Sequence, residues 1–112
     1  MTSRVRVQTP SGPVEGVEER GVRVFRGIPY AGSTAGDGRF RAPEPVVAWC
    51  ETRDASEFAQ AAPQSGGGKG LFRNFSPIPG AGIGEECLNL NVWTPADAGP
   101  PRPVLVWVHG GG

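Results

Sequence analysis

The alternation of polar and apolar residues near the start of the chain predicts a series of short antiparallel strands. Residues 4–9 alternate the two kinds of side chain, as a strand with one wet face does. Residues 10–13, Pro-Ser-Gly-Pro, are expected to break this strand, and residues 14–17 to form a second one. Arg20-Gly21 predicts another turn, after which residues 22–28 form a third strand that Pro29 ends. Short strands joined by tight turns make an antiparallel meander.

The middle of the chain has weaker periodicity. Residues 39–45 contain two prolines one residue apart, which excludes a helix and favours extended geometry. Trp49 is expected to pack on the body of the domain. Residues 54–60 predict one or two helical turns, because Asp54 stands at a capping position with Glu57 three residues later.

A stretch of low order is expected over residues 61–84, where ten of 24 residues are Gly or Pro. Loops of this length inside a compact domain are uncommon and are usually functional or disordered. Leu71, Phe72 and Phe75 interrupt it with apolar side chains. These residues either pin the loop to the surface or, at Phe72 and Phe75, line a substrate pocket.

Two further strands are predicted beyond this stretch. Within residues 85–95, Leu88, Leu90 and Val92 alternate with two asparagines and a tryptophan. Residues 104–108, Val-Leu-Val-Trp-Val, are an unbroken apolar run, which is typical of a strand covered on both faces in a parallel sheet. His109 and then three glycines follow, and glycines let the backbone approach a ligand closely with its N–H groups free to donate.

Composition and charge exclude several classes of partner. The chain has 112 residues, with eleven basic and eleven acidic side chains, so no charge excess favours nucleic acid or an anionic membrane. No apolar signal region follows the first residues, and a cytoplasmic protein is expected. Cys50 and Cys87 lack the spacing of a metal or redox site and are expected to be small buried side chains, with a disulfide only in an oxidising compartment.

The chain resembles the N-terminal part of type-B carboxylesterases, a family that includes cholinesterases, bacterial para-nitrobenzyl esterases and some lipases. The residues that carry the resemblance follow the family's order and spacing: Phe-Arg-Gly-Ile-Pro-Tyr-Ala at 25–31, Arg-Phe at 39–40, the run at 85–95, and residues 104–112 ending in His-Gly-Gly-Gly. The last tetrapeptide, placed after a buried strand, is the motif that forms part of the oxyanion hole in lipases and esterases.

The resemblance implies an α/β protein with the α/β-hydrolase fold. Residues 1–112 would be the N-terminal segment of a single carboxylesterase domain, cut after the His-Gly-Gly-Gly motif. This segment would comprise an antiparallel β meander, a long loop and the first strands of the central sheet. The family's nucleophilic serine, its acid and its catalytic histidine lie further on, and no Gly-x-Ser-x-Gly elbow occurs in these residues.

By the same resemblance, Gly111 and Gly112 supply two N–H donors of the oxyanion hole, and the residue after the absent serine supplies a third. A plain glycine turn is the alternative role for these residues. His109 belongs to the hole loop and is not expected to be the catalytic base, because no nucleophile adjoins it in the sequence. Arg39 and Glu85 match the family's internal ion pair, which is expected to be buried and to tie the start of the long loop region to its end.

Two departures from the family pattern change the expectations. Secreted members often close the long loop with a disulfide from the position of Cys87 to a cysteine just before Pro-Gln, where this chain has Ala62. Cys87 is therefore expected to be a free thiol, as in an intracellular protein. Ser33 and Thr34 stand where many members have two prolines.

The expected activity of the parent protein is carboxylic ester hydrolysis by a serine hydrolase through an acyl-enzyme, on a small-molecule ester, without metal or cofactor. The 112 residues alone are expected to be inactive and unable to fold stably by themselves. Two alternatives stay open, namely a catalytically dead cholinesterase-like binding protein and a truncated remnant without function. The oligomeric state is not set by the sequence.

Overall fold

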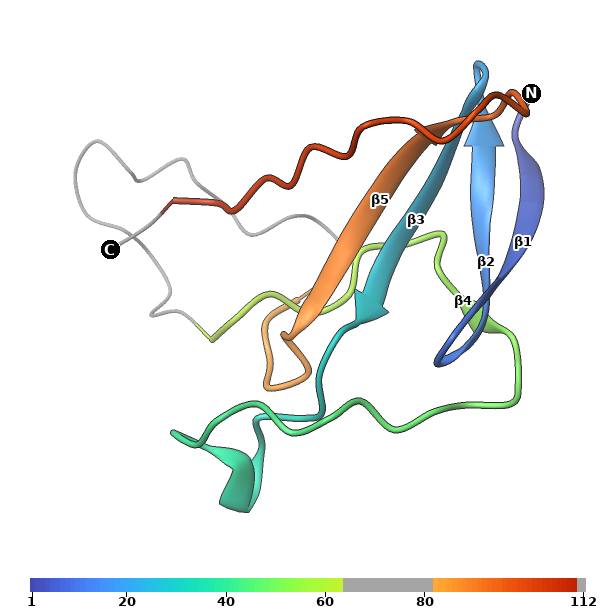
Figure 1. Ribbon diagram of the computed structural model, residues 1–112. Helices are drawn as coiled ribbons and strands as arrows, with labels where there is room; N and C mark the ends of the chain where they lie inside the picture. The colour runs from blue at the N-terminus through green and yellow to red at the C-terminus, as the bar shows by residue number, and fades with distance from the viewer. Residues whose placement is uncertain (64–81, 111–112) are drawn as a thin grey trace.

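A computed structural model describes residues 1–63 and 82–110, and the strands among them form one twisted β-sheet (Figure 1). Its strands are β1 Ser3–Thr9, β2 Gly12–Glu19, β3 Val22–Pro29, β4 Arg53–Asp54 and β5 Asn89–Pro95. The sheet order is β1-β2-β3-β5, and β4 pairs with β2 away from this path. A short 3-10 turn, η1 Gly36–Gly38, lies in the loop that follows β3.

The predicted antiparallel meander is confirmed, with a tighter first turn than expected. The Thr9 hydroxyl accepts from the Gly12 N–H at 3.1 Å and donates to the Gly12 carbonyl at 2.7 Å. This closes the hairpin at Pro10 and Ser11, so β2 already begins at Gly12 and the predicted four-residue break was wrong. In the second hairpin, Arg20 and Gly21 have φ of 50° and 76°, the positive values that suit the twist of two-residue hairpin turns.

A bulge interrupts the pairing of β3 with β5. The antiparallel register shifts between Phe25 and Ile28, so that Arg26 and Gly27 both lie opposite Asn91. Gly27 has a φ of 67°, and its N–H donates to the Asn91 side-chain oxygen at 2.9 Å. The bulge leaves the Arg26 N–H free to bind a different segment.

That segment is the short strand β4 and the residue after it. β4 runs parallel to β2, with Arg53 opposite Val14, at the end where β2 and β3 diverge. The Ala55 N–H donates to the Glu15 carbonyl at 2.7 Å, and the Ala55 carbonyl accepts from the Arg26 N–H at 2.7 Å. The predicted helix at 54–60 was therefore wrong, because the sheet takes the backbone groups of its first residues. Asp54 still accepts from the Ser56 N–H at 2.9 Å, which is a capping bond without a helix.

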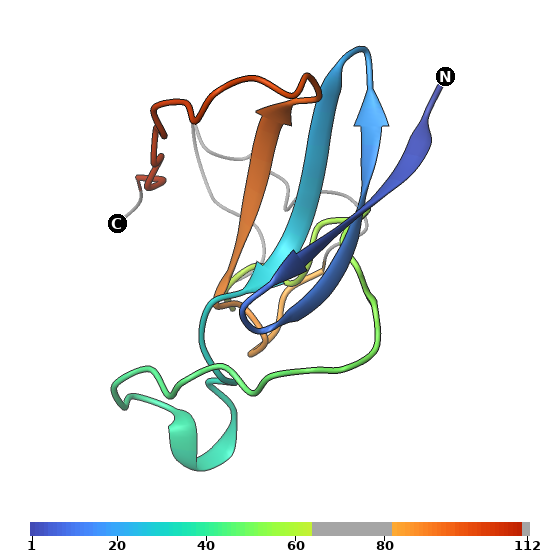
Figure 2. The ribbon, with the colours of Figure 1, turned by 45° about the vertical axis from the view of Figure 1, so that its right-hand side comes forward.

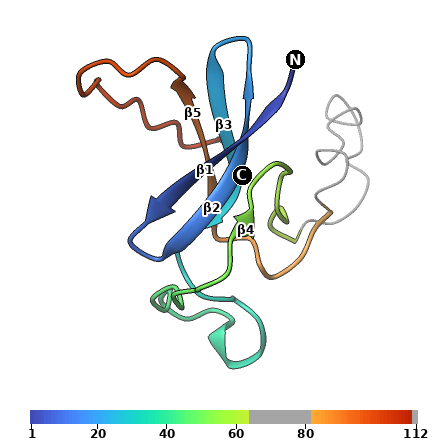
Figure 3. The ribbon, with the colours of Figure 1, turned by 90° about the vertical axis from the view of Figure 1, so that its right-hand side faces the viewer.

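The core is small. Its buried members are Val14, Phe25 and Ala55, and Val5, Ile28 and Trp49 pack around them. The predicted packing of Trp49 on the domain is confirmed, since its indole N–H also donates to the Pro13 carbonyl at 2.9 Å. Figures 2 and 3 show a single layer, with β1 crossing β2 and the residues between β3 and β4 looping beyond one end of the sheet.

Residues 104–108 do not form the predicted strand. These residues are 77% to 90% exposed, and the segment leads away from the sheet after β5 (Figure 1). Among the described residues, no strand pairs with it, and backbone pairing is what defines a strand. The residues between β5 and this segment are held in place. The Ala96 N–H donates to the Gly21 carbonyl at 2.8 Å, and Arg102 pairs with Asp97 at 2.6 Å.

The two cysteines differ from expectation in one respect. Both are free thiols, as predicted for Cys87, but Cys50 is exposed and Cys87 is only partly buried, so their predicted burial was wrong. Within residues 1–63 and 82–110, no three His, Cys, Asp or Glu side chains lie close enough to hold a metal ion. The same residues contain no helix that is long and apolar enough to cross a membrane.

Gly16→Ala is expected to destabilise the protein by about 1–3 kcal/mol, the usual range for overpacking. A Cβ at Gly16 would lie 2.2 Å from the Val24 carbonyl oxygen and 2.6 Å from the Phe25 ring, so the strand must shift. Urea unfolding of the whole protein measures the loss. Gly21→Asn is the matched control, because the turn there is open and asparagine tolerates its positive φ; equal stability of the two variants would contradict the packing argument.

Asp54→Asn is expected to remove a small part of the acid sensitivity of the fold. Hydrogen bonds from the Ser56 hydroxyl and amide hold the pKa of Asp54 below its ordinary value of 3.8. Because the folded pKa is the lower one, the stabilisation is complete above the unfolded pKa and is lost as the pH falls through the folded one. The side chain is 66% exposed, so the effect should stay below about 1 kcal/mol.

Unfolding free energies of the wild type and Asp54→Asn should differ near neutral pH and converge well below pH 3.8. A difference that is the same at every pH would show that the charge of this carboxylate plays no part.

Candidate functional site

The glycine-rich motif is described only in part. His109 and Gly110 are exposed, and the His109 Nδ1 donates to the Gly110 carbonyl at 2.8 Å. Among the described residues, no hydroxyl or thiol is hydrogen-bonded to this imidazole, and its one hydrogen bond is to the backbone. Gly111 and Gly112 lie outside the described residues, so their role as oxyanion-hole donors stays a prediction. Phe72 and Phe75, expected at a substrate pocket, and Leu71 also lie outside them.

The two ends of the long central stretch meet at a neck, which consists of Gln60, Ala61, residues 82–86 and Asn89. Ala61 and Ile83 form a parallel bridge, in which the Ala61 N–H donates to Gly82 and the Gly84 N–H donates to Ala61, both at 3.0 Å. Gln60 joins both sides, because its side-chain oxygen accepts from the Glu86 N–H at 3.1 Å and its carbonyl accepts from the Asn89 amide at 2.9 Å. The neck is held without a covalent link.

Arg39 and Glu85 are brought together at this neck. The Arg39 Nη2 donates to the Glu85 Oε1, but the two side chains are 55% and 32% exposed, so the expected burial of the pair was wrong. The pair lies at the surface, and Arg39 is followed by a fully exposed residue, Phe40. A pair exposed to this degree contributes modestly to stability.

Thr34 also binds Glu85, through the backbone carbonyl of that residue. Its N–H donates to the Glu85 carbonyl at 3.2 Å, and its hydroxyl donates to the same oxygen at 2.8 Å. The hydroxyl also lies 4.0 Å from the Cys87 sulfur. A proline at position 34 has neither donor, so the departure from the family pattern creates an additional attachment between the loop after β3 and the neck.

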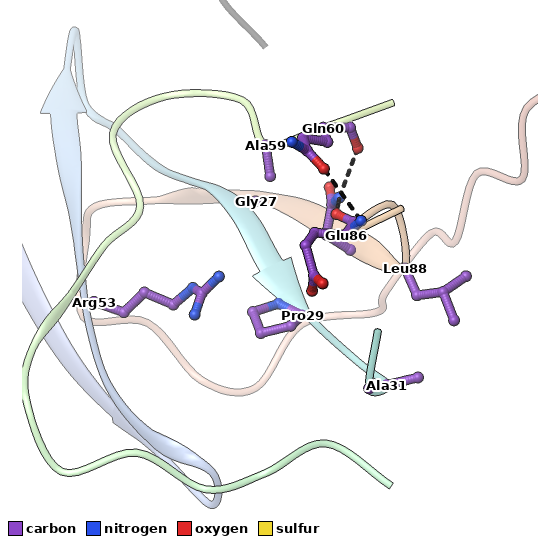
Figure 4. A pocket seen from close by; sticks show the side chains of 10 residues that line it. Gly27, Pro29, Ala31, Arg53, Ala59, Gln60, Glu86 and Leu88 are labelled. Carbon is purple, nitrogen blue, oxygen red and sulfur yellow. Dashed lines mark hydrogen bonds between the residues drawn. The ribbon is translucent and has the colours of Figure 1, made fainter. Parts of the chain in front are cut away.

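A cavity of about 260 Å³ lies beside the neck (Figure 4). In Figure 4 the side chains of Arg53 and Glu86 both extend toward Pro29. The Arg53 guanidinium also lies 5.5 Å from the Trp49 ring centroid. The cavity thus offers one cationic and one anionic group, both of them exposed.

Sequence reasoning missed the polar residues that build the neck and the bulge. Gln60 and Asn89 have no local motif, because their partners lie far away along the chain. Asn91 could have been found through Gly27, since an isolated glycine in a strand pattern is typical of a bulge whose freed N–H needs an acceptor. Thr34 stood out only as a departure from the family pattern.

Comparison with solved structures shows the fold to which this sheet belongs. A para-nitrobenzyl esterase structure superposes with a TM-score of 0.81 at 37% identity, covering 95% of this chain and 21% of that one. A carboxylesterase from Geobacillus stearothermophilus gives a TM-score of 0.75 at 40% identity, covering 95% of this chain and 19% of that one. The chain has the N-terminal portion of an α/β-hydrolase fold, which confirms the predicted fold class.

Sequence comparison is equally specific. Phenmedipham hydrolase from Pseudarthrobacter oxydans is 44% identical over 114 residues, covering 100% of this chain and 22% of that protein. Para-nitrobenzyl esterase from Bacillus subtilis (strain 168) is 38% identical over 111 residues, covering 99% of this chain and 22% of that protein. The chain therefore spans about a fifth of the length of these relatives.

The model of the carboxylesterase family matches residues 3–112, almost the whole chain. The protein belongs to the carboxylesterase family, as the sequence motifs predicted.

Glu85→Ala in the whole protein is expected to lower the unfolding midpoint more than it alters the affinity for substrate. The variant loses the Arg39 pair but keeps the Thr34 bonds, which use the backbone carbonyl, so the loss should be about 1 kcal/mol or less. Thermal unfolding and KM are the two measurements. Asp97→Ala, which removes an exposed pair outside the neck, serves as control. An unchanged melting curve for Glu85→Ala would contradict the stabilising role.

Proposed function

We propose that this chain is part of a carboxylic ester hydrolase in which Gly111 and Gly112 supply donors of the oxyanion hole. The observation that carries the proposal is the His-Gly-Gly-Gly sequence at 109–112 within a chain that matches the carboxylesterase family over residues 3–112. Several curated relatives are named as hydrolases or esterases, which does not favour the alternative of a catalytically dead binding protein.

The proposed chemistry is acyl transfer through a serine supplied by the rest of the protein. Attack on the ester carbonyl produces a tetrahedral intermediate whose oxygen is negative. The N–H groups of Gly111 and Gly112 would donate to this oxygen, and donors of this kind each contribute about 3 kcal/mol to transition-state binding. Collapse releases the alcohol and leaves an acyl-enzyme, which water hydrolyses. His109 contributes through its backbone contact with Gly110 rather than by proton transfer.

The substrate class follows from this chemistry and from the relatives. Para-nitrobenzyl esterase, by its name, acts on para-nitrobenzyl esters, and a small carboxylic ester is the substrate proposed here. No cofactor or metal is part of the proposal.

The test uses the whole protein and a chromogenic ester, para-nitrophenyl acetate. Gly111→Pro and Gly112→Pro each delete one N–H donor and are expected to lower kcat about 10²–10³-fold. Gly110→Pro is the matched control, since it stiffens the same loop at a residue to which no donor role is assigned. Thermal unfolding midpoints show whether each variant is folded.

The oxyanion-hole assignment fails if Gly110→Pro loses as much activity as the other two variants. The enzyme assignment fails if the whole protein neither hydrolyses esters nor reacts with a fluorophosphonate, a probe for activated serines. The 112 residues alone should be inactive, because loss of the nucleophile in a serine hydrolase costs on the order of 10⁶ in kcat.

A further inference from the structure

Phe40 combines two features that are unfavourable for an aromatic residue. The residue is fully exposed, and its backbone has a φ of 60°. Left-handed backbone is costly for residues with a Cβ, and it persists only where the surrounding structure imposes it. Full exposure of the ring adds the cost of a hydrated aromatic surface. Within the described residues, no contact of the ring offsets the cost of either feature.

The backbone around Phe40 is well held on both sides, so its position is not that of a fraying loop. The Arg39 N–H donates to the Gly36 carbonyl at 3.2 Å, and the Arg41 N–H donates to the Gly38 carbonyl at 3.3 Å. The Arg39 side chain is paired with Glu85 at the neck. Two successive turns and an ion pair thus present the ring outward.

The surroundings of the ring indicate the chemistry of a complementary surface. A hollow of about 520 Å³ lies directly beside Phe40, between the loop after β3 and the neck. Arginines precede and follow the ring. Arg39 is engaged by Glu85, whereas Arg41 makes no ion pair within residues 1–63 and 82–110. A fitting surface would have an apolar pocket for the ring, a side chain that fills the hollow, and an acceptor for Arg41.

We propose that Phe40 is an anchor that inserts into an apolar pocket of the remaining part of the carboxylesterase domain. The occupant is assigned to the same protein because this chain covers only 22% of its phenmedipham hydrolase relative. A surface within the same polypeptide meets the ring at a high effective concentration, whereas a second copy must be recruited from solution. The inference rests on family membership and not on the proposed catalytic function.

Two substitutions in the whole protein separate the ring from the backbone strain. Phe40→Ala removes the ring and keeps a Cβ at the positive φ; Phe40→Gly removes the ring and also relieves the strain. If the ring is buried as proposed, both variants lower the unfolding midpoint, by about 3 °C or more. If the ring is in solvent, the alanine variant melts like the wild type and the glycine variant melts higher, which overturns the proposal.

Thiol labelling of the whole protein tests the same point without relying on stability. Phe40→Cys, in a background with Cys50→Ser and Cys87→Ser, should react with a maleimide about tenfold or more slowly than it does in urea. Asp37→Cys is the matched control, because it lies in the same loop, is exposed and has no assigned partner surface; it should react freely. Rapid labelling of the Phe40→Cys variant overturns the proposal.

Two further results would identify a different surface as the one that covers Phe40, and each would also overturn the proposal. Protection that disappears on dilution indicates a second copy of the protein. Protection that disappears when Leu71, Phe72 and Phe75 are replaced by serine indicates the loop of this same segment. Protection that survives both changes supports burial against the rest of the domain. None of these readouts depends on ester hydrolysis, so a failure of the proposed function would leave the result interpretable.

Discussion

The architecture of this segment depends on the two backbone hydrogen bonds of Ala55. β2 pairs with β3 only over residues Val17 to Glu19. Toward the N-terminal end of β2 the two strands separate. The gap would leave the Glu15 carbonyl and the Arg26 N–H without partners, and such unsatisfied buried groups cost about 1–3 kcal/mol each. Ala55 binds both at 2.7 Å and is 1% exposed, so only a small side chain fits. The bulge at Gly27 is the matching feature in β3, because it turns the Arg26 N–H away from β5.

This arrangement positions the neck as well as the sheet. The chain passes from Ala55 to Gln60 along the Arg26 side chain. The Arg26 guanidinium donates to the Ser56 carbonyl at 2.8 Å and lies 5.1 Å from the Phe58 ring centroid. Gln60 then forms the neck with the residues that precede β5. One sheet therefore sets both where the long stretch leaves the fold and where it returns.

Sequence patterns predicted the parts of the fold that depend on near neighbours. The meander follows from alternation and from the turn chemistry at Arg20-Gly21, and the family follows from motifs in a fixed order. The helix predicted at 54–60 was wrong because capping residues are a local signal, whereas the partner of Ala55 is forty residues away in Glu15. Residues 104–108 have the composition of a strand, but composition does not supply a pairing neighbour. For the site, motif recognition found Arg39 and Glu85 but not their exposure, which depends on how the loop at Phe40 projects.

The neck affects how well the fold tolerates sequence changes between Ala61 and Ile83. Because Ala61 and Ile83 are joined by backbone bonds, the two ends of the stretch between them are held by the neck and not by the sequence of that stretch. The entropic cost of such closure grows only by about 0.6 kcal/mol for each doubling of loop length. Insertions, deletions and exchanges between these two residues are therefore nearly independent of the stability of the sheet. Related proteins can diverge in this stretch while the strands on either side keep the same register.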